Sequence, residues 1–276
     1  MSMSSQHSPK TENVAAVLKV FSVLEALVEE RSAGLADLAH TAMTSKSTAH
    51  RLLQTMADLG YVAQDPDTEK YHLTLKLFSL GAKSLRGQED VLRVADRVMG
   101  GLSRATGEAI NLGVMDGHDQ RVTYIHKYDS TYSLAMQSKL GYRNPLHSTS
   151  LGKALLAFRA DDEVNDRLAR MQFVKLAPRT ITDAATLHTE LMQVRATGIA
   201  EEIEESEAGV RCMATPVLDH MGTSAAAISV AFPLFRFDEA KKPEIAAQLR
   251  AAGLEASRAL GYSGAAIGTA SPVGAG

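Results

Sequence analysis

The stretch from Thr44 to Gly60 constrains the fold most, because it predicts one amphipathic helix with a defined start and end. Thr44 or Ser45 can cap the helix, since a short hydroxyl accepts hydrogen bonds from first-turn amides that lack intrahelical partners. Gly60 suits the C′ position, where a left-handed backbone is common. The apolar side chains recur at helical spacing and form one stripe, made of Ala49, Leu52, Leu53 and Met56.

The opposite face of this helix carries hydrogen-bond donors in its first two turns. These side chains are mostly short or cationic, and they are Ser45, Lys46, Ser47, Thr48, His50 and Arg51. A helix that enters a DNA major groove needs such groups to reach phosphates and base edges. An ordinary helix with a solvated polar face has the same pattern, so the helix alone leaves both interpretations open.

The flanking segments favour the DNA-binding interpretation. A first helix can begin at a cap on Asn13, and its apolar positions are Val17, Val20, Phe21, Leu24, Leu27 and Val28. A turn at 32–34 and a short helix over 35–42 then complete helix-turn-helix geometry. Residues 61–64 and 71–73 are β-prone and flank a turn-rich stretch, which predicts a hairpin, or wing. A helical bundle that merely ends in a hairpin is the alternative.

Overall charge gives no support for nucleic-acid binding. The net charge is −3, and the first 86 residues hold nine basic and nine acidic side chains, a difference of zero. Any DNA contact must therefore depend on local placement of basic groups. No stretch approaches the roughly 18 apolar residues of a membrane-spanning helix, and the polar N-terminus lacks the features of a signal peptide. We expect a cytoplasmic protein without membrane contact.

The pattern predicts an α+β protein with a domain on each side of a linker. We expect a disordered N-terminus (1–12), a winged helix-turn-helix domain (13–75), a linker helix region (76–88), a second domain (89–262) and a flexible tail (263–276). In the second domain the expected strands are 109–115, 122–126, 132–137, 200–205, 210–218 and 225–232. The expected helices are 89–105, 148–158, 161–171, 182–195 and 238–260. Strands grouped apart from helices favour a sheet with a pocket on one face.

The segment from Pro145 to Leu155 is a candidate anion site. Ser148 or Thr149 can cap a helix whose free first-turn amides and dipole favour a carboxylate or phosphate. Gly152 would let a small ligand approach the backbone. The alternative is a plain capped helix in which Gly152 allows a close packing contact.

Cys212 is the only cysteine, which excludes disulfide frameworks and cysteine-based zinc sites within one chain. It lies in an expected strand, where a free thiol commonly packs as a small hydrophobic group. An enzyme would need a base such as His147 to activate it. The acidic run over 201–207 fits a solvated face with one inward carboxylate for a polar ligand. No metal-binding histidine spacing occurs, so we expect neither a metal nor another cofactor.

Several motifs resemble those of the IclR-type transcriptional regulators. Residues 46–53 with 59–62 are similar to the family's recognition helix and the start of its wing. Residues 145–155 and 207–217 resemble its two effector-domain motifs, and 227–230 its final pocket strand. The likeness covers roughly residues 14–262. Further matches, at 45–48, 69–71, 73–78, 124–127 and 143–145, resemble the branch that represses pectin and 2-keto-3-deoxygluconate breakdown.

The resemblance implies a winged helix-turn-helix, a linker helix and a GAF-like α/β effector-binding domain. It also implies dimers or tetramers on palindromic double-stranded operator DNA, and a small anionic metabolite as effector. The family's ligand-binding positions correspond to Ser150 and Leu151, through their backbone amides, and to Glu202, Cys212 and Ser229.

Two positions depart from the family pattern. Glu202 stands where aspartate is common, so its extra methylene shifts a contact or shrinks the cavity. Ala231 stands where glyoxylate-responsive members have a second serine, which makes a two-carbon keto acid a poorer fit. A longer sugar acid, whose hydroxyls meet Glu202 and either Asn111 or Arg143, fits better.

Two classes of function follow from these patterns. The first is an effector-responsive transcription factor, which is a repressor in the branch named above. The second is a small-molecule enzyme that uses Cys212 or His147, with the N-terminal helices serving only in assembly. The helix-turn-helix and wing favour the first, because an enzyme has no use for them.

Overall fold

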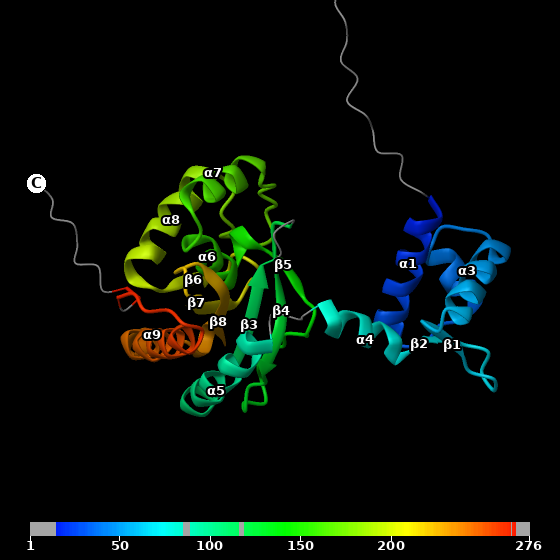
Figure 1. Ribbon diagram of the computed structural model, residues 1–276, viewed down its shortest axis with the longest axis horizontal. Helices are drawn as coiled ribbons and strands as arrows, with labels where there is room; N and C mark the ends of the chain where they lie inside the picture. The colour runs from blue at the N-terminus through cyan, green and yellow to red at the C-terminus, as the bar shows by residue number, and fades with distance from the viewer. Residues whose placement is uncertain (1–14, 85–88, 116–118, 266, 269–276) are drawn as a thin grey trace, which may run out of the picture. The chain divides into compact units, whose positions relative to one another are not determined.

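The computed structural model describes residues 15–84, 89–115, 119–265 and 267–268. The chain divides into two compact units, 1–86 and 87–276, which we describe separately (Figure 1). The expected cap at Asn13 and the expected disordered N-terminus lie outside the described residues.

The N-terminal unit has the expected order of helices and strands. Its elements are α1 (Ala15–Glu30), α2 (Leu35–Thr41), α3 (Lys46–Asp58), β1 (Val62–Gln64), β2 (Tyr71–Leu73) and α4 (Leu75–Ser84). The two strands pair antiparallel, with Val62 opposite Leu73, and form the predicted wing. Ala33, in the turn before α2, bridges to Tyr71 and so ties the wing to the helices.

The core of this unit differs from the sequence prediction in α1. Val23 and Leu27 are buried, whereas Val17, Phe21 and Val28 of the predicted stripe are exposed. The helix carries two apolar stripes, and the one that contains Val23 faces α2, α3 and the wing through Leu38, Leu53, Met56 and Tyr71. In α3 the prediction is confirmed, because Ala49, Leu53 and Met56 are buried and Leu52 is half-buried.

The C-terminal unit is built on a six-stranded antiparallel sheet with strand order β5-β4-β3-β8-β7-β6. The strands are β3 (Ala109–Met115), β4 (Arg121–Tyr128), β5 (Arg143–Pro145), β6 (Ala200–Ile203), β7 (Val210–Leu218) and β8 (Ser224–Pro233). The helices are α5 (Glu89–Thr106), α6 (Ser150–Ala157), α7 (Asp161–Arg170), α8 (Ala184–Thr197) and α9 (Lys242–Ala259). The α+β fold is thus confirmed.

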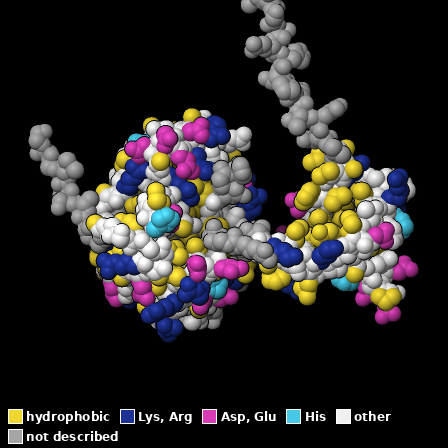
Figure 2. All heavy atoms as spheres, in the orientation of Figure 1, with side chains coloured by type: hydrophobic (Ala, Val, Ile, Leu, Met, Phe, Trp, Pro, Cys, Tyr) yellow, Lys and Arg dark blue, Asp and Glu magenta, His cyan; other side chains and the backbone are white. Residues whose placement is uncertain are grey.

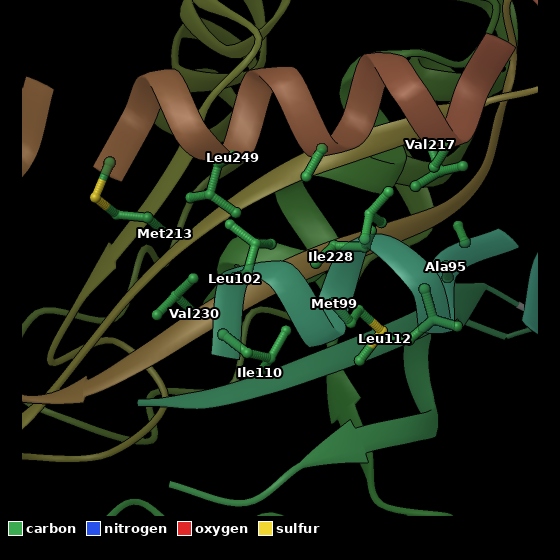
Figure 3. Close-up of a cluster of buried hydrophobic side chains, with 14 of the residues drawn as sticks. Ala95, Met99, Leu102, Ile110, Leu112, Met213, Val217, Ile228, Val230 and Leu249 are labelled. Atoms are coloured by element: carbon green, nitrogen blue, oxygen red, sulfur yellow. The ribbon is translucent and has the colours of Figure 1, made fainter. Parts of the chain in front are cut away.

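Helices cover both faces of this sheet. On one face α5 and α9 pack through Met99, Leu102 and Leu249 against strand residues such as Ile110 and Ile228 (Figure 3). On the other face α6 and α8 contribute Leu155, Leu187 and Leu191 to a second core. Gly198 ends α8 in a left-handed conformation, which costs glycine little.

One expectation for this unit is wrong. Residues 132–137, expected as a strand, form an irregular segment between β4 and β5, and the strand there is Arg143–Pro145. Within the expected flexible tail, the side chain of Ile267 is buried beside Gly198, and the flexibility of the tail stays a prediction. The remainder of the tail at 266 and 269–276 lies outside the described residues.

Candidate nucleic-acid interface and ligand pocket

The start of α3 is fixed by its own hydroxyl side chains. The Ser45 hydroxyl accepts a hydrogen bond from the Thr48 amide at 3.2 Å and donates to the Thr48 hydroxyl at 3.0 Å. Ser45 is therefore the N-cap that the sequence predicted. The Ser47 hydroxyl also lies 3.0 Å from that of Ser45. The DNA contacts predicted for Ser45, Ser47 and Thr48 stay predictions.

The remaining predicted donors are exposed on α3. Lys46, Ser47, His50 and Arg51 all face solvent. Two further exposed polar side chains, Gln54 and Thr55, extend this surface by one turn. Sequence reasoning stopped at the second turn and missed them, although Gln54 follows His50 by four residues and so shares its face.

The end of α3, the wing and α4 are joined by Lys76. Its ammonium group donates to the Leu59 carbonyl oxygen at 2.6 Å and lies 4.8 Å from the centre of the Tyr61 ring. The Thr74 hydroxyl donates to the Gly60 carbonyl at 2.6 Å. Gly60 has a φ of 77°, the left-handed conformation expected of it. These contacts hold the wing at a fixed position beside α3.

A cavity of about 90 Å³ in the C-terminal unit collects most of the predicted ligand-binding residues. Ser150, Glu202, Cys212 and Ser229 border it. Leu151 does not, because its side chain is buried in the core beside Gly113. The prediction for Leu151 concerned its amide in the first turn of α6, and that role stays a prediction.

Strand register explains why these residues meet. Glu202 on β6 is paired with Cys212 on β7, and Cys212 is paired with Ala231 on β8. On the other side of β8, Ser229 is paired with Asn111 of β3. Paired residues of antiparallel strands project to the same face of the sheet. Residues up to 120 positions apart in the sequence therefore line one cavity wall.

Glu202 contacts the start of α6 directly. One carboxyl oxygen accepts from the Ser150 amide at 3.4 Å, and the other accepts from the Ser206 amide at 3.0 Å and from the Ser206 hydroxyl. Burial raises the pKa of Glu202, and these hydrogen bonds oppose that rise. The helix N-terminus predicted to hold a ligand's carboxylate thus already faces a carboxyl group of the protein.

The start of α6 is a plain capped helix in which Gly152 allows close packing, which was the alternative to an anion site. Thr149 caps the helix, with its hydroxyl accepting from the Gly152 amide at 3.0 Å. A Cβ on Gly152 would lie 2.2 Å from the Leu146 carbonyl oxygen. Gly152 therefore permits close backbone packing with the preceding turn and is not among the residues that line the cavity.

Other polar residues of the cavity were missed or misplaced by sequence reasoning. Tyr124, Asn144 and Ser206 line it, and so does the irregular segment Met136, Gln137 and Ser138. The Ser138 hydroxyl donates to the side chain of Asn111, which lines the cavity as one of the two predicted alternatives. The other, Arg143, points elsewhere and pairs with Asp119. No sequence pattern signals the irregular segment, because its position depends on the chain returning over the sheet.

The structure does not support a catalytic cysteine. Cys212 borders the ligand cavity, whereas His147 lines a different hollow and contacts the Val174 carbonyl oxygen at 3.1 Å. Burial and the nearby Glu202 carboxyl raise the pKa of the Cys212 thiol. A nucleophilic cysteine needs a lowered pKa, so the raised pKa of Cys212 disfavours its use as a nucleophile.

The described residues contain neither a metal-binding cluster nor a membrane-spanning helix. No three histidine, cysteine or acidic side chains there are arranged to hold a metal ion. Nor is any described helix both long and apolar enough to span a membrane.

Comparisons with known proteins agree with this geometry. Residues 16–66 match the IclR helix-turn-helix domain and residues 84–258 match the C-terminal domain of the bacterial transcriptional regulator IclR. The HTH-type transcriptional regulator KdgR of Escherichia coli K12 is 48% identical over 251 residues, which cover 91% of this chain and 94% of that protein.

Solved structures give the same result. The Thermotoga maritima IclR crystal structure superimposes with a TM-score of 0.76 at 29% identity, covering 91% of this chain and all of that one. An IclR homologue from Microbacterium hydrocarbonoxydans, complexed with 4-hydroxybenzoate, has a TM-score of 0.73 at 24% identity, with coverages of 89% and 98%.

A winged helix-turn-helix that presents polar donors, joined to an α/β unit with a polar cavity, defines a DNA-binding transcription regulator. The chain belongs to the IclR family of bacterial transcriptional regulators. These relatives are regulators, so the enzyme hypothesis is set aside.

Proposed function

We propose that this regulator represses genes of sugar-acid catabolism and is released from its operator by a small carboxylate ligand. One observation carries the proposal. The same chain holds an exposed surface of hydrogen-bond donors on α3 and, in its other unit, a polar cavity. The likeness to KdgR favours 2-keto-3-deoxygluconate, a keto sugar acid, as the ligand and pectin breakdown as the regulated pathway.

Four exposed α3 side chains are the proposed direct DNA contacts, and they are Lys46, Ser47, His50 and Arg51. Arginine is suited to bidentate contact with guanine, and one such contact contributes roughly 1–3 kcal/mol of discrimination. Ser45 and Thr48 orient these groups through the cap.

Operator binding by Arg51→Ala tests this surface. We expect a loss of roughly 1–3 kcal/mol, with unchanged thermal stability because the side chain is exposed. Arg93→Ala is the matched control, since Arg93 is an exposed arginine of the C-terminal unit paired with exposed Asp90. Parent-like affinity of Arg51→Ala for the protein's own upstream DNA would show that α3 does not read the operator.

The ligand proposal depends on the polar lining of the cavity. Ser229, Asn111 and Tyr124 supply hydroxyl and amide groups for the hydroxyls of a sugar acid. Ala231 offers no hydrogen bond, which disfavours a two-carbon keto acid. The 4-hydroxybenzoate complex of the Microbacterium homologue supports the proposal, because that protein of the same fold takes a small carboxylate.

Calorimetry on Ser229→Ala beside the parent tests the cavity, and operator titrations with ligand then test the switch. Filling the cavity should weaken operator binding roughly 5–150-fold, the range of a coupling of about 1–3 kcal/mol. By linkage, operator DNA should weaken ligand binding by the same factor. If Ser229→Ala bound the ligand as tightly as the parent protein, the cavity would not be the ligand site. If the ligand bound tightly but did not change operator affinity, the cavity would still be the ligand site, but ligand binding would not control DNA binding.

A further inference from the structure

The charges around the cavity are unusual for a site that takes an anion. Among the described residues that line it, Glu202 and Glu207 are acidic, and none is lysine, arginine or histidine. Glu207 is exposed, so water screens its charge, whereas Glu202 is 2% exposed. An entering carboxylate therefore meets a buried carboxyl group and no cation.

Lys153, the buried cation that acts on Glu202, is already committed to other carboxyl groups. The Lys153 ammonium donates to a Glu190 carboxyl oxygen at 2.6 Å, to a Glu205 carboxyl oxygen at 2.7 Å and to the Glu201 carbonyl oxygen at 2.9 Å. An ammonium group has three protons, and all three are used. The single positive charge of Lys153 is therefore shared by Glu190 and Glu205. Its ammonium group has no N–H left to donate to a ligand.

We propose that Glu202 binds the ligand's carboxylate as a neutral carboxylic acid, so that an anionic ligand and one proton enter the cavity together. This inference rests on the proposed function, because it concerns the same cavity and the same class of ligand. It makes Glu202 a specificity-determining residue, which favours ligands with a single carboxylate over those that bring a second negative charge.

The geometry of Glu202 suits a carboxylic acid. One oxygen is fixed by the Ser206 amide and hydroxyl, so it remains an acceptor. The other lies 3.4 Å from the Ser150 amide, near the upper limit for a hydrogen bond, so that contact is weak. A proton on this second oxygen gives a donor for the ligand, and hydrogen bonds to an ionised acceptor are short and strong. The Ser150 amide can then turn to the same carboxylate.

Burial opposes the ionisation of Glu202, and the charge of a bound ligand would add to that effect. Burial raises its pKa, while Lys153 and the hydrogen bonds from Ser206 and Ser150 lower it. The pKa values of the Cys212 thiol and the Tyr124 hydroxyl are both raised, so these neighbours stay neutral. The other titratable groups nearby are Glu205, Glu207 and Tyr142. A bound carboxylate adds a negative charge and raises the pKa of Glu202 further.

Calorimetry with 2-keto-3-deoxygluconate, in pairs of buffers with different ionisation enthalpies between about pH 6 and pH 9, measures the protons taken up. We expect an uptake of up to one proton per ligand bound. Where free Glu202 is ionised, the Kd should increase with pH, by at most about tenfold for each pH unit. Glu202→Gln keeps the shape of the neutral acid and should bind the ligand without proton uptake and with a flat pH profile. Glu255→Gln, at an exposed acidic residue of α9 on the other face of the sheet, should behave as the parent.

Each outcome decides the proposal. Ligand binding to the parent without proton uptake overturns it and leaves the proposed function intact. Uptake that persists in Glu202→Gln also overturns it, because the proton then resides on another group such as Glu205. Failure of the ligand to bind the parent overturns both this inference and the proposed effector. If Glu202→Gln fails to fold, a pH-indicator dye in unbuffered parent protein counts the protons independently.

Discussion

At the scale of single residues, one cluster of buried charge in the C-terminal unit is centred on Lys153. Lys153 is fully buried and bonded to Glu190 and Glu205. A buried cation of this kind is costly to leave without its partners. Two of its members are close in sequence to residues that line the cavity, because Lys153 follows Ser150 by one turn of α6 and Glu205 follows Glu202 by three residues.

The stability of the protein should fall as pH rises toward neutrality. Burial raises the pKa of Glu205 from 4.5 to about 7. The folded state therefore binds this proton more tightly than the unfolded chain, so the stabilisation is complete below about pH 4.5 and is lost as pH rises through about 7. Glu205→Gln should flatten this part of the profile. Thermal unfolding of the parent and of Glu205→Gln at a series of pH values checks this prediction. If stability changed with pH in the same way in both proteins, Glu205 would not be the group responsible.

A second residue-scale prediction separates folding from DNA contact in α3. Leu53 is fully buried in the core of the N-terminal unit. Leu53→Ala should lower the free energy of unfolding by about 2–5 kcal/mol through a cavity in that core. Arg51→Ala should leave it unchanged. Denaturant unfolding measures both, and equal stabilities for the two variants would disagree with the packing described.

At the scale of elements, the fold depends on how closely α6 approaches the turn before it. Thr149 caps the helix and Gly152 lies against the backbone of Leu146. This junction places the Ser150 amide at the cavity wall, next to Glu202. Helix propensity alone would favour alanine over glycine at position 152. Glycine is needed there because of the close contact with the backbone of Leu146.

Two glycine substitutions should therefore have opposite effects on stability. Gly152→Ala places a Cβ 2.2 Å from the Leu146 oxygen, so the backbone must shift and stability should fall by about 1–3 kcal/mol. Gly101→Ala, on the exposed face of α5, meets nothing within 4 Å and should raise stability by up to about 1 kcal/mol. Melting temperatures of the two variants give the comparison. A Gly152→Ala protein as stable as Gly101→Ala would contradict the close contact.

At the scale of the whole molecule, the unexplained feature is an apolar face of the N-terminal unit. Val17, Leu18 and Phe21 of α1 are 50%, 54% and 59% exposed. Figure 2 shows hydrophobic side chains gathered over this helix. Apolar patches of this kind commonly mark protein contacts, and palindromic operators require paired recognition helices. We therefore expect a homodimer or tetramer in which this face of α1 contributes a contact.

Phe21→Ser should weaken that assembly without unfolding the unit, because the side chain is exposed in the single chain. Light scattering at micromolar concentration should give a dimer or larger mass for the parent, and the variant should bind operator DNA more weakly. A monomeric parent, with and without DNA, would rule out the paired arrangement. Lys19→Ser, on the same helix but with a charged side chain, is the matched control.

The sequence by itself determined most of the N-terminal unit and the order of elements. Capping by Ser45, the apolar stripe of α3 and the turn between β1 and β2 are local signals, because each depends on residues within a few positions of one another. The family motifs also marked Ser150, Glu202, Cys212 and Ser229, which the structure brings to one cavity.

Tertiary structure alone decided which apolar stripe of α1 is buried, where residues 132–137 run, and what occupies the α6 N-terminus. Both stripes of α1 have helical spacing, and only packing against α2 and α3 distinguishes them. The contact between Glu202 and Ser150 joins residues 52 positions apart, through the pairing of β6 with β7. Such long-range pairings leave no periodic trace in the sequence, because they depend on which strands become neighbours in the sheet.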